Sequence, residues 1–413
     1  MGSLAPPKLL GDLTCLPSDG LLTIMNSQRS RRRICFVITS LIHYSRNMLV
    51  LDELKRRKDV ELHVAIGGTT LISRYTSKYG AVRHILERER FGNVHEVHFN
   101  LEGDVPIVKA KTAGLGIIEF STLFNNIKPD LVVVRGDRFE VLAAVIAAAF
   151  SNIPIAHIEG GDVSGTIDES VRHAITKFSH IHFPTNGESQ KRILRMGEHP
   201  DYVFNYGSPD VEVVHKITSP SKNFDMKKTG SGADIDLGRE YLMVMYHPVV
   251  TELDQVLKNI TSLLRAIHGL GMQTLWFWPN ADLGSEIISR ELRAFNDNEK
   301  GHAIRFMRDI NPQEFIWLLR NSRCLVGNSS AGIKECSYLG IPVVNVGSRQ
   351  NGRLRAHNVL NVHHDEGAIR RAIDKQLRIK RYPPSNLYLA KNTSKNIAKT
   401  LATVGLYVQK NFV

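Results

Sequence analysis

Cysteine is scarce in this sequence, because a chain of 413 residues carries only four, at positions 15, 35, 324 and 336. That density is too low for a disulfide framework. No two of the cysteines form a Cys-x-x-Cys pair, so the sequence gives no support for a zinc site. We therefore predict a protein without structural disulfides and without a metal.

Long apolar runs are absent as well. No uninterrupted apolar stretch approaches the roughly 18 residues that a membrane-spanning helix requires. The N-terminal segment lacks both the basic start and the apolar centre of about 7–15 residues that define a signal peptide. These absences predict a cytoplasmic protein with no membrane partner, and we expect residues 1–30 to form a flexible extension.

Aromatic residues are few, at 7% of the chain, whereas Lys and Arg (53) outnumber Asp and Glu (41) and give a net charge of +12. A basic balance of this size is typical of proteins that bind nucleic acid or an anionic small molecule. The basic clusters at 29–33 and 369–382 have no interleaved aromatic residues on which bases would stack. No helix-turn-helix or RNP-like signature is present, so we predict no nucleic-acid partner.

What the sequence does contain is a repeated alternation of short β-branched runs and longer amphipathic stretches such as 140–151. The short runs are continuously apolar, which predicts parallel strands covered on both faces. Strands that alternate with helices in this way predict an α/β fold. The expected strands are 33–39, 62–66, 130–136, 154–160, 201–207, 240–248, 273–279, 302–307, 323–328 and 342–347.

One polar segment, 219–238, interrupts the alternation and is short of apolar residues. Five expected strands precede it and five follow it. We therefore predict two Rossmann-like, doubly wound parallel-sheet domains, with the ligand in the cleft at the carboxyl ends of the strands. The predicted parts are a first domain at 31–207, a linker at 208–238, a second domain at 239–380 and a C-terminal helical segment at 381–413 that packs back on the first domain.

Polar residues that follow the strands of the first half are the candidates for acid–base chemistry. Asp137 and Arg138 follow one expected strand, and Glu159 lies at the end of the next. Asp168 stands where a helix is expected to begin, and Arg172 shares its helix face four residues later. The alternative for each carboxylate is that it is only a turn or helix-cap residue.

In the second half, His247 ends one expected strand, and Asn280 and Asp282 follow another. The segment 327–332, Gly-Asn-Ser-Ser-Ala-Gly, is neither a Walker A loop nor a Gly-x-Gly-x-x-Gly motif. Its small residues nevertheless let backbone N–H groups approach an anion at the start of a helix. Glu335, about one and a half turns into that helix, is placed to reach a ribose hydroxyl.

The segment 136–183 closely resembles the hydrolysing UDP-N-acetylglucosamine 2-epimerases, which make N-acetylmannosamine for sialic acid synthesis. The block HIEGG-x-VSGTID-x-S-x-RHAITK carries most of the likeness. YHPV, PNADLGS, GNSSAGIKE and GSRQNGR match in the same order farther along the chain. The resemblance covers roughly 33–380 and implies the GT-B architecture, with two Rossmann-like domains and the active site in the interdomain cleft.

The resemblance also implies roles for individual residues. It implies that Asp137, Glu159 and Asp168 are catalytic carboxylates, and that Arg172 and His247 act beside them. The substrate- and nucleotide-binding residues that it implies are Ser45, Arg138, Asn280, Asp282, Ser329, Ser330, Glu335 and Arg349.

One position departs from the family pattern. Where the family usually has an arginine in its first loop, this chain has Leu41. Arg46 and the nearby Arg33 are the two alternatives for a basic residue that replaces it.

The implied reaction is the hydrolysing 2-epimerisation of UDP-N-acetylglucosamine to N-acetylmannosamine and UDP. It proceeds by elimination of UDP to a 2-acetamidoglucal and addition of water, and it needs no cofactor. The family is commonly dimeric or tetrameric, so we expect a homodimer or homotetramer. The alternatives are the same chemistry on UDP-diacetylbacillosamine or GDP-GlcNAc, a non-hydrolysing 2-epimerase, a GT-B glycosyltransferase, and an inactive nucleotide-sugar binder.

Overall fold

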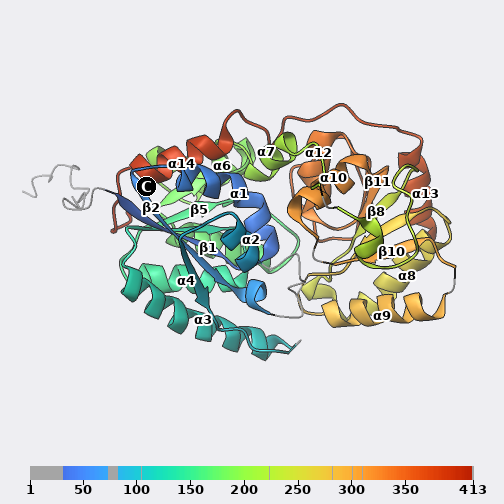
Figure 1. Ribbon diagram of the computed structural model, residues 1–413, viewed down its shortest axis with the longest axis horizontal. Helices are drawn as coiled ribbons and strands as arrows, with labels where there is room; N and C mark the ends of the chain where they lie inside the picture. The colour runs from blue at the N-terminus through green and yellow to red at the C-terminus, as the bar shows by residue number, and fades with distance from the viewer. Residues whose placement is uncertain are drawn as a thin grey trace, which may run out of the picture.

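The computed structural model describes residues 31–411, apart from 73–81 and the single positions 104, 223, 281, 300 and 309. The expected N-terminal extension, residues 1–30, lies outside the described residues. Two sheets lie side by side along the molecule, and helices cover both faces of each (Figure 1). The predicted α/β fold with two doubly wound sheets is confirmed.

The first sheet has six parallel strands in the order β3-β2-β1-β4-β5-β6. Successive residues of its central strand enter two cores: Ile34 and Phe36 pack with α1, α2 and α14, whereas Cys35 and Val37 pack with α3 and α4. Both faces are therefore buried, which explains the continuously apolar run. The strands are β1 (Arg32–Ile38), β2 (Val60–Gly67), β3 (Asn93–Val97), β4 (Leu131–Arg135), β5 (Ile155–Ile158) and β6 (Ile181–Phe183). The helices are α1 (Leu41–Lys55), α2 (Val82–Arg88), α3 (Pro106–Ile127), α4 (Phe139–Phe150), α5 (Asp168–Phe178) and α6 (Gly187–Arg195), with 3-10 turns at Gly68–Leu71 and Pro200–Tyr202.

The second sheet has the order β13-β12-β11-β8-β9-β10-β7, and only the short edge strand β7 is antiparallel. Its central strand β8 also feeds two cores, with Leu242 and Val244 on one face and Met243 on the other. The strands are β7 (Ser231–Gly232), β8 (Leu242–Met245), β9 (Thr274–Phe277), β10 (Ile304–Met307), β11 (Cys324–Gly327), β12 (Val343–Val346) and β13 (Val359–Val362). The helices are α8 (Val256–His268), α9 (Ser285–Asn298), α10 (Pro312–Asn321), α11 (Ser330–Ile333), α12 (Glu335–Leu339) and α13 (Glu366–Leu377), with a 3-10 segment at Val250–Gln255.

Two helices lie where the chain passes between the sheets. Helix α7 (Pro209–Lys216) follows the first sheet and is largely buried. Helix α14 (Thr393–Thr403) returns from the second sheet, lies beside α1 and buries Ile397 and Leu401 in the first core (Figure 1). The segment 208–238 thus contains a buried helix, a 3-10 turn at Met226–Lys228 and the edge strand β7. The predicted domain boundaries themselves stay a prediction.

Three local expectations differ from the structure. The strand expected at 201–207 is wrong, because Pro200–Tyr202 forms a 3-10 turn and only Val203 makes a single bridge to β6. The edge strands β3, β7 and β13 were not expected, because their residues are polar or partly exposed. The single helix expected after Gly332 is interrupted at Lys334, so Glu335 is the first residue of α12 and does not lie one and a half turns into a helix.

In the part of the chain that the structure describes, no helix is both long enough and apolar enough to span a bilayer.

Candidate functional site

A cavity of about 330 Å³ opens between the two sheets, at the carboxyl ends of β4, β5, β8 and β11. This is the position at which doubly wound sheets usually hold ligands. Arg172 and Asp282 are not among the residues that line the cavity. The predicted site residues that line the cavity are Ser45, Asp137, Arg138, Glu159, Asp168, His247, Asn280, Ser329, Ser330, Glu335 and Arg349.

Asp137 follows β4 and keeps part of its carboxylate exposed to the cavity, with the side chain 25% accessible. Arg172, from α5, is completely buried beneath it and donates a hydrogen bond to Asp137 Oδ2. The same guanidinium donates to the carbonyl of Asp162 at 3.0 Å. Arg172 therefore orients Asp137 from below and does not reach the cavity itself.

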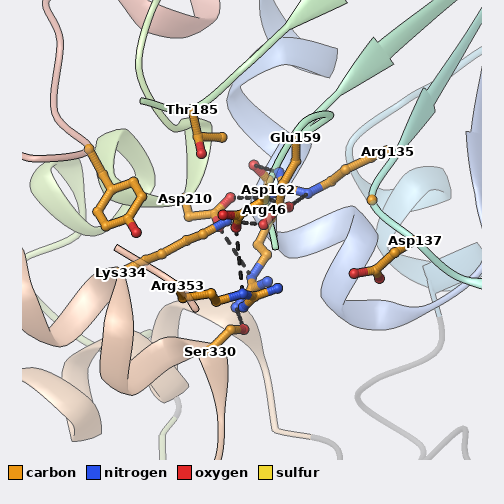
Figure 2. Close-up of polar contacts among 12 residues, drawn as sticks. Arg46, Arg135, Asp137, Glu159, Asp162, Thr185, Asp210, Ser330, Lys334 and Arg353 are labelled. Atoms are coloured by element: carbon orange, nitrogen blue, oxygen red, sulfur yellow. Dashed lines mark hydrogen bonds and ion pairs between the residues drawn. The ribbon is translucent and has the colours of Figure 1, made fainter. Parts of the chain in front are cut away.

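Glu159 follows β5 with a φ of +71°, in a left-handed region that residues other than glycine seldom adopt. Arg135, at the end of β4, donates two hydrogen bonds to Glu159 Oε2, at 2.7 and 3.0 Å. Lys334 donates to Oε1 from the other side of the cleft (Figure 2). Such backbone strain persists only where surrounding contacts hold it, and here ion pairs occupy both carboxylate oxygens.

Asp168 is the first residue of α5, and its Oδ2 accepts a hydrogen bond from Thr166 at 2.9 Å. Burial, and next the negative charge of Asp282 in the second half of the chain, raise the pKa of Asp168. A carboxyl in this environment holds its proton to higher pH, which suits a general acid. Asp168 and Asp282 thus form a pair of carboxyl groups whose proton affinities are driven apart.

Asp282 behaves in the opposite way to Asp168. Burial opposes its ionisation, but the nearby charges of Arg138 and Arg349 hold the pKa of Asp282 below its ordinary value. Arg138 lies 3.7 Å from Asp282 and also pairs with Glu140 at 2.8 Å. Arg349 lies 4.0 Å from Asp282. Asp282 therefore acts on the site by fixing these two arginines, both of which face the cavity.

His247 follows β8 and is locked to the loop after β11. Its backbone N–H donates to Asn328 Oδ1 at 2.8 Å, and Asn328 Nδ2 donates back to the His247 carbonyl at 2.8 Å. Its Nδ1 accepts a hydrogen bond from the Asn280 backbone N–H at 3.1 Å. Burial lowers the pKa of His247 to about 3. The ring is therefore neutral, and with Nδ1 an acceptor its proton sits on Nε2.

The loop after β11 supplies polar groups to one end of the cavity. Ser329 caps α11 by accepting a hydrogen bond from the Ala331 backbone N–H at 3.3 Å. Within the described residues, Glu335 Oε2 and Asn280 Oδ1 are buried oxygens without a hydrogen-bond partner. Ser164 Oγ and Asp210 Oδ2 belong to the same group, and both residues line the same cavity. Buried polar atoms are normally satisfied, so these atoms are available to water or to a polar ligand.

The residues that were expected in a first loop, Leu41 and Ser45, lie in the first turns of helix α1. Leu41 lines the cavity, and Ser45 lies beside it with its hydroxyl bonded to the Ile42 carbonyl at 3.0 Å. Arg46 reaches across the cleft to Ser330 Oγ at 2.9 Å (Figure 2). It also donates to Glu335 Oε1 at 3.1 Å. Arg33 instead pairs with Glu61 at 3.1 Å near the other end of β1. Of the two candidates to replace the family's arginine, Arg46 lines the cavity and Arg33 does not.

Sequence reasoning missed a set of buried charges at the cavity, of which Arg135, Asp210 and Arg353 line it and Lys334 does not. Asp210, on α7, hydrogen-bonds Arg135 and lies 3.6 Å from Arg46. Lys334 is fully buried, and Arg353 lies 3.5 Å from Asp162. In the sequence these residues are recognisable only as charged residues at the end of an apolar strand or inside a helix. Their positions do not identify the residues with which they pair.

No group of three or more His, Cys, Asp or Glu side chains suited to a metal ion occurs among the residues that the structure describes. The side chains that line the cavity offer carboxyl, guanidinium, imidazole and hydroxyl groups. Carboxyl groups of the first half of the chain share this cavity with the polar loop after β11.

Comparison with known proteins gives concordant results. The family model described as UDP-N-acetylglucosamine 2-epimerase matches residues 52–402. The UDP-N,N'-diacetylbacillosamine 2-epimerase (hydrolyzing) of Legionella pneumophila is 32% identical over 378 residues, which cover 92% of this chain and 97% of that protein. The UDP-N-acetylglucosamine 2-epimerase of Neisseria meningitidis is 30% identical over 359 residues, which cover 86% of this chain and 90% of that protein.

A solved structure shares the fold. It is the crystal structure of UDP-GlcNAc 2-epimerase from Neisseria meningitidis bound to UDP-GlcNAc. It superposes with a TM-score of 0.71 at 18% identity, over 89% of this chain and 99% of that chain. The predicted GT-B-like architecture is thereby confirmed.

Proposed function

The chain belongs to the UDP-N-acetylglucosamine 2-epimerase family, and from this premise we propose that it converts UDP-N-acetylglucosamine and water to N-acetylmannosamine and UDP. The observation that carries the proposal is the pairing of carboxyl groups after β4, β5 and at the start of α5 with a polar loop after β11 across one cavity. This arrangement sets acid–base groups opposite a site for the leaving diphosphate. N-acetylmannosamine is a precursor of sialic acids, and we infer that the enzyme serves that synthesis.

The reaction divides into two balanced steps. In the first, a carboxylate takes the C2 proton, the C2–H electron pair forms the C1–C2 double bond, and the C1–O bond breaks with its electrons leaving on UDP. In the second, water adds its oxygen to C1 and a proton is delivered to C2 from the opposite face. The sum consumes one water and releases UDP and the free mannose-configured sugar.

The residues divide these tasks according to their surroundings. Asp137 keeps part of its carboxylate in the cavity and is our candidate for the base at C2. Asp168, whose pKa is raised by burial and by Asp282, is the candidate acid that returns a proton. Neutral His247 donates a hydrogen bond from Nε2 to the departing phosphate oxygen without needing to change charge. Glu159, with both oxygens in ion pairs, organises the site electrostatically.

The test is an NMR assay of the full chain with UDP-N-acetylglucosamine in deuterated water. We expect UDP, free N-acetylmannosamine and deuterium at C2. The matched inactive control is Asp137→Asn, which keeps the shape of the side chain but not its basicity. Release of UDP-N-acetylmannosamine, or of N-acetylglucosamine without deuterium, contradicts the proposal. Tight UDP binding without any product identifies an inactive binder.

A second substrate, UDP-N,N'-diacetylbacillosamine, is favoured by the Legionella pneumophila relative, which is named for it. The two sugars differ at C4 and C6, away from the atoms that react. Equal concentrations of both in one reaction give the ratio of their kcat/KM values directly. We expect UDP-N-acetylglucosamine to be preferred, and a preference of tenfold or more for the bacillosamine derivative reverses the assignment of substrate.

A further inference from the structure

Six charged groups from different parts of the chain meet beside the cavity, and all of them except Lys334 line it. They balance in sign, three cations against three carboxylates. Each contacts at least one group of opposite sign, and together they join elements of both sheets (Figure 2). The six are Arg46 on α1, Arg135 at the end of β4, Glu159 after β5, Asp210 on α7, and Lys334 and Glu335 at α12.

Lys334 is unusual within this cluster. Its side chain is completely buried and is absent from the cavity lining, although its sequence neighbour Glu335 lines the cavity. Its ammonium donates to Glu159 Oε1, lies 3.9 Å from Asp210 Oδ2 and sits 5.9 Å above the Tyr388 ring. Lys334 therefore contacts a cavity residue of the first sheet from a helix of the second, without access to the substrate.

Stability alone does not account for a buried pair of this kind. Removing two charges from water usually costs more than their attraction returns, so apolar residues of similar volume are often as stable or more stable. The chain also breaks the helix at Lys334, with φ −96° and ψ −68°, which separates α11 from α12 at this residue. At this break the Lys334 side chain contacts Glu159, whereas Ser330 and Glu335 line the cavity.

We propose that Lys334 is a positioning residue that holds Glu159 in its place and thereby ties the loop that receives the nucleotide to the carboxylates of the first sheet. The inference rests on the proposed function, since Glu159 matters only if the site performs the epimerisation. Lys334 acts through Glu159 and not on the substrate. Its loss therefore lowers turnover and leaves binding of the nucleotide nearly unchanged.

The experiment compares Lys334→Met, Lys334→Arg, Glu159→Gln and the double variant in the full chain. We expect Lys334→Met to lower kcat by about 100-fold, while KM and the calorimetric Kd for UDP change by less than about threefold. Lys334→Arg keeps the charge, and we expect its kcat to be at least about tenfold higher than that of Lys334→Met. Lys258→Met, an exposed lysine on α8, is the matched control and keeps wild-type kinetics.

The double variant isolates the pair. If Lys334 acts only through Glu159, Glu159→Gln/Lys334→Met is no slower than Glu159→Gln alone. A further tenfold loss in the double variant overturns the proposal, as does a tenfold weaker Kd for UDP in Lys334→Met. If Lys334→Met does not fold, the double variant, which loses one charge of each sign, is compared with Glu159→Gln under the same criterion.

Failure of the proposed function is recognised separately. If wild-type protein releases UDP from neither sugar, the substrate assignment fails. The urea midpoints of wild type, Lys334→Met, Glu159→Gln and the double variant then decide whether the pair couples the sheets. Non-additive shifts support the coupling, and additive shifts overturn it.

Discussion

At the scale of single residues, Asp168 carries a prediction about pH. Its pKa rises above the ordinary 3.8 on folding because of burial and of Asp282. A carboxyl of this kind is harder to ionise in the folded state, so the wild-type protein loses stability as the pH rises from 3.8 through the folded pKa. Asp168→Asn removes this loss, and we expect its melting midpoint at pH 7 to exceed that of wild type by on the order of 1 °C.

We expect the same variant to lose about 100-fold or more in kcat, because in the proposed mechanism Asp168 transfers a proton. The measurement is a series of thermal melts between pH 4 and pH 8, together with turnover at pH 7. Asp201→Asn, at an exposed position, is the control and shows no such trend. A midpoint for Asp168→Asn that lies below that of wild type at pH 7, or a gap that closes as the pH rises, contradicts the prediction.

The site residues that could be predicted from the sequence are those that directly follow a buried strand. Asp137 and Glu159 follow neighbouring buried strands of the first sheet, and the carboxyl ends of parallel strands meet at one edge, so their convergence on one cavity was predictable. Lys334 was not, because its partner Glu159 is 175 residues away in the chain and only the packing of the two sheets brings them together. Pairing between distant charges leaves no periodic signal in a sequence.

At the scale of elements, β11 ends in a turn that only glycine fits. Gly327 has a φ of +131°, and a Cβ atom there would lie 2.1 Å from the Met245 carbonyl oxygen of β8. Gly327→Ala therefore has to separate β11 from β8 and to move the loop that holds His247 through Asn328. We expect a loss of about 3 kcal/mol or more in the free energy of unfolding, measured in urea.

Gly271→Ala is the matched control for Gly327→Ala. Gly271 also has a positive φ, of +63°, but no atom lies within 4 Å of the place that a Cβ atom would take there. It therefore bears only the conformational cost of about 1 kcal/mol. Equal losses in the two variants would show that the close approach of β8 is not what requires glycine at 327.

The elements themselves were predictable where burial is complete. Runs such as 130–136 are apolar because both faces of the strand are covered, and β4 forms there. The segment 201–207 shows the limit of this reasoning. Its Tyr202, Phe204 and Tyr206 pack against the first core as a strand would, yet they do so without a ladder of strand hydrogen bonds. An alternating apolar pattern predicts that one face of a segment is buried, but it does not predict whether the backbone pairs with a neighbouring strand.

At the scale of the whole molecule, two loops, one from each half of the chain, contact each other. This contact was not predicted from the sequence. The loop 162–167 leads into Asp168, and the loop 347–353 follows β12. The Gly165 N–H donates to the Arg349 carbonyl at 3.2 Å, and Arg353 donates to the Val163 carbonyl at 3.1 Å. The placement of Asp168 therefore depends on contact between the loops as well as on its own helix.

Gly165→Ala tests this dependence. A Cβ atom at Gly165 would lie 2.4 Å from the Ser348 carbonyl oxygen, so the two loops must separate while each sheet keeps its own core. A displacement of about 1 Å at a catalytic group costs on the order of 100-fold in rate, and we expect kcat to fall by about that factor. Thermal melts should stay within a few degrees of wild type, since no core contact is lost. Gly187→Ala, at a position with no atom within 4 Å of its Cβ, is the control and keeps full turnover. Wild-type kcat in Gly165→Ala would mean that Asp168 is positioned by α5 alone, without help from the second sheet.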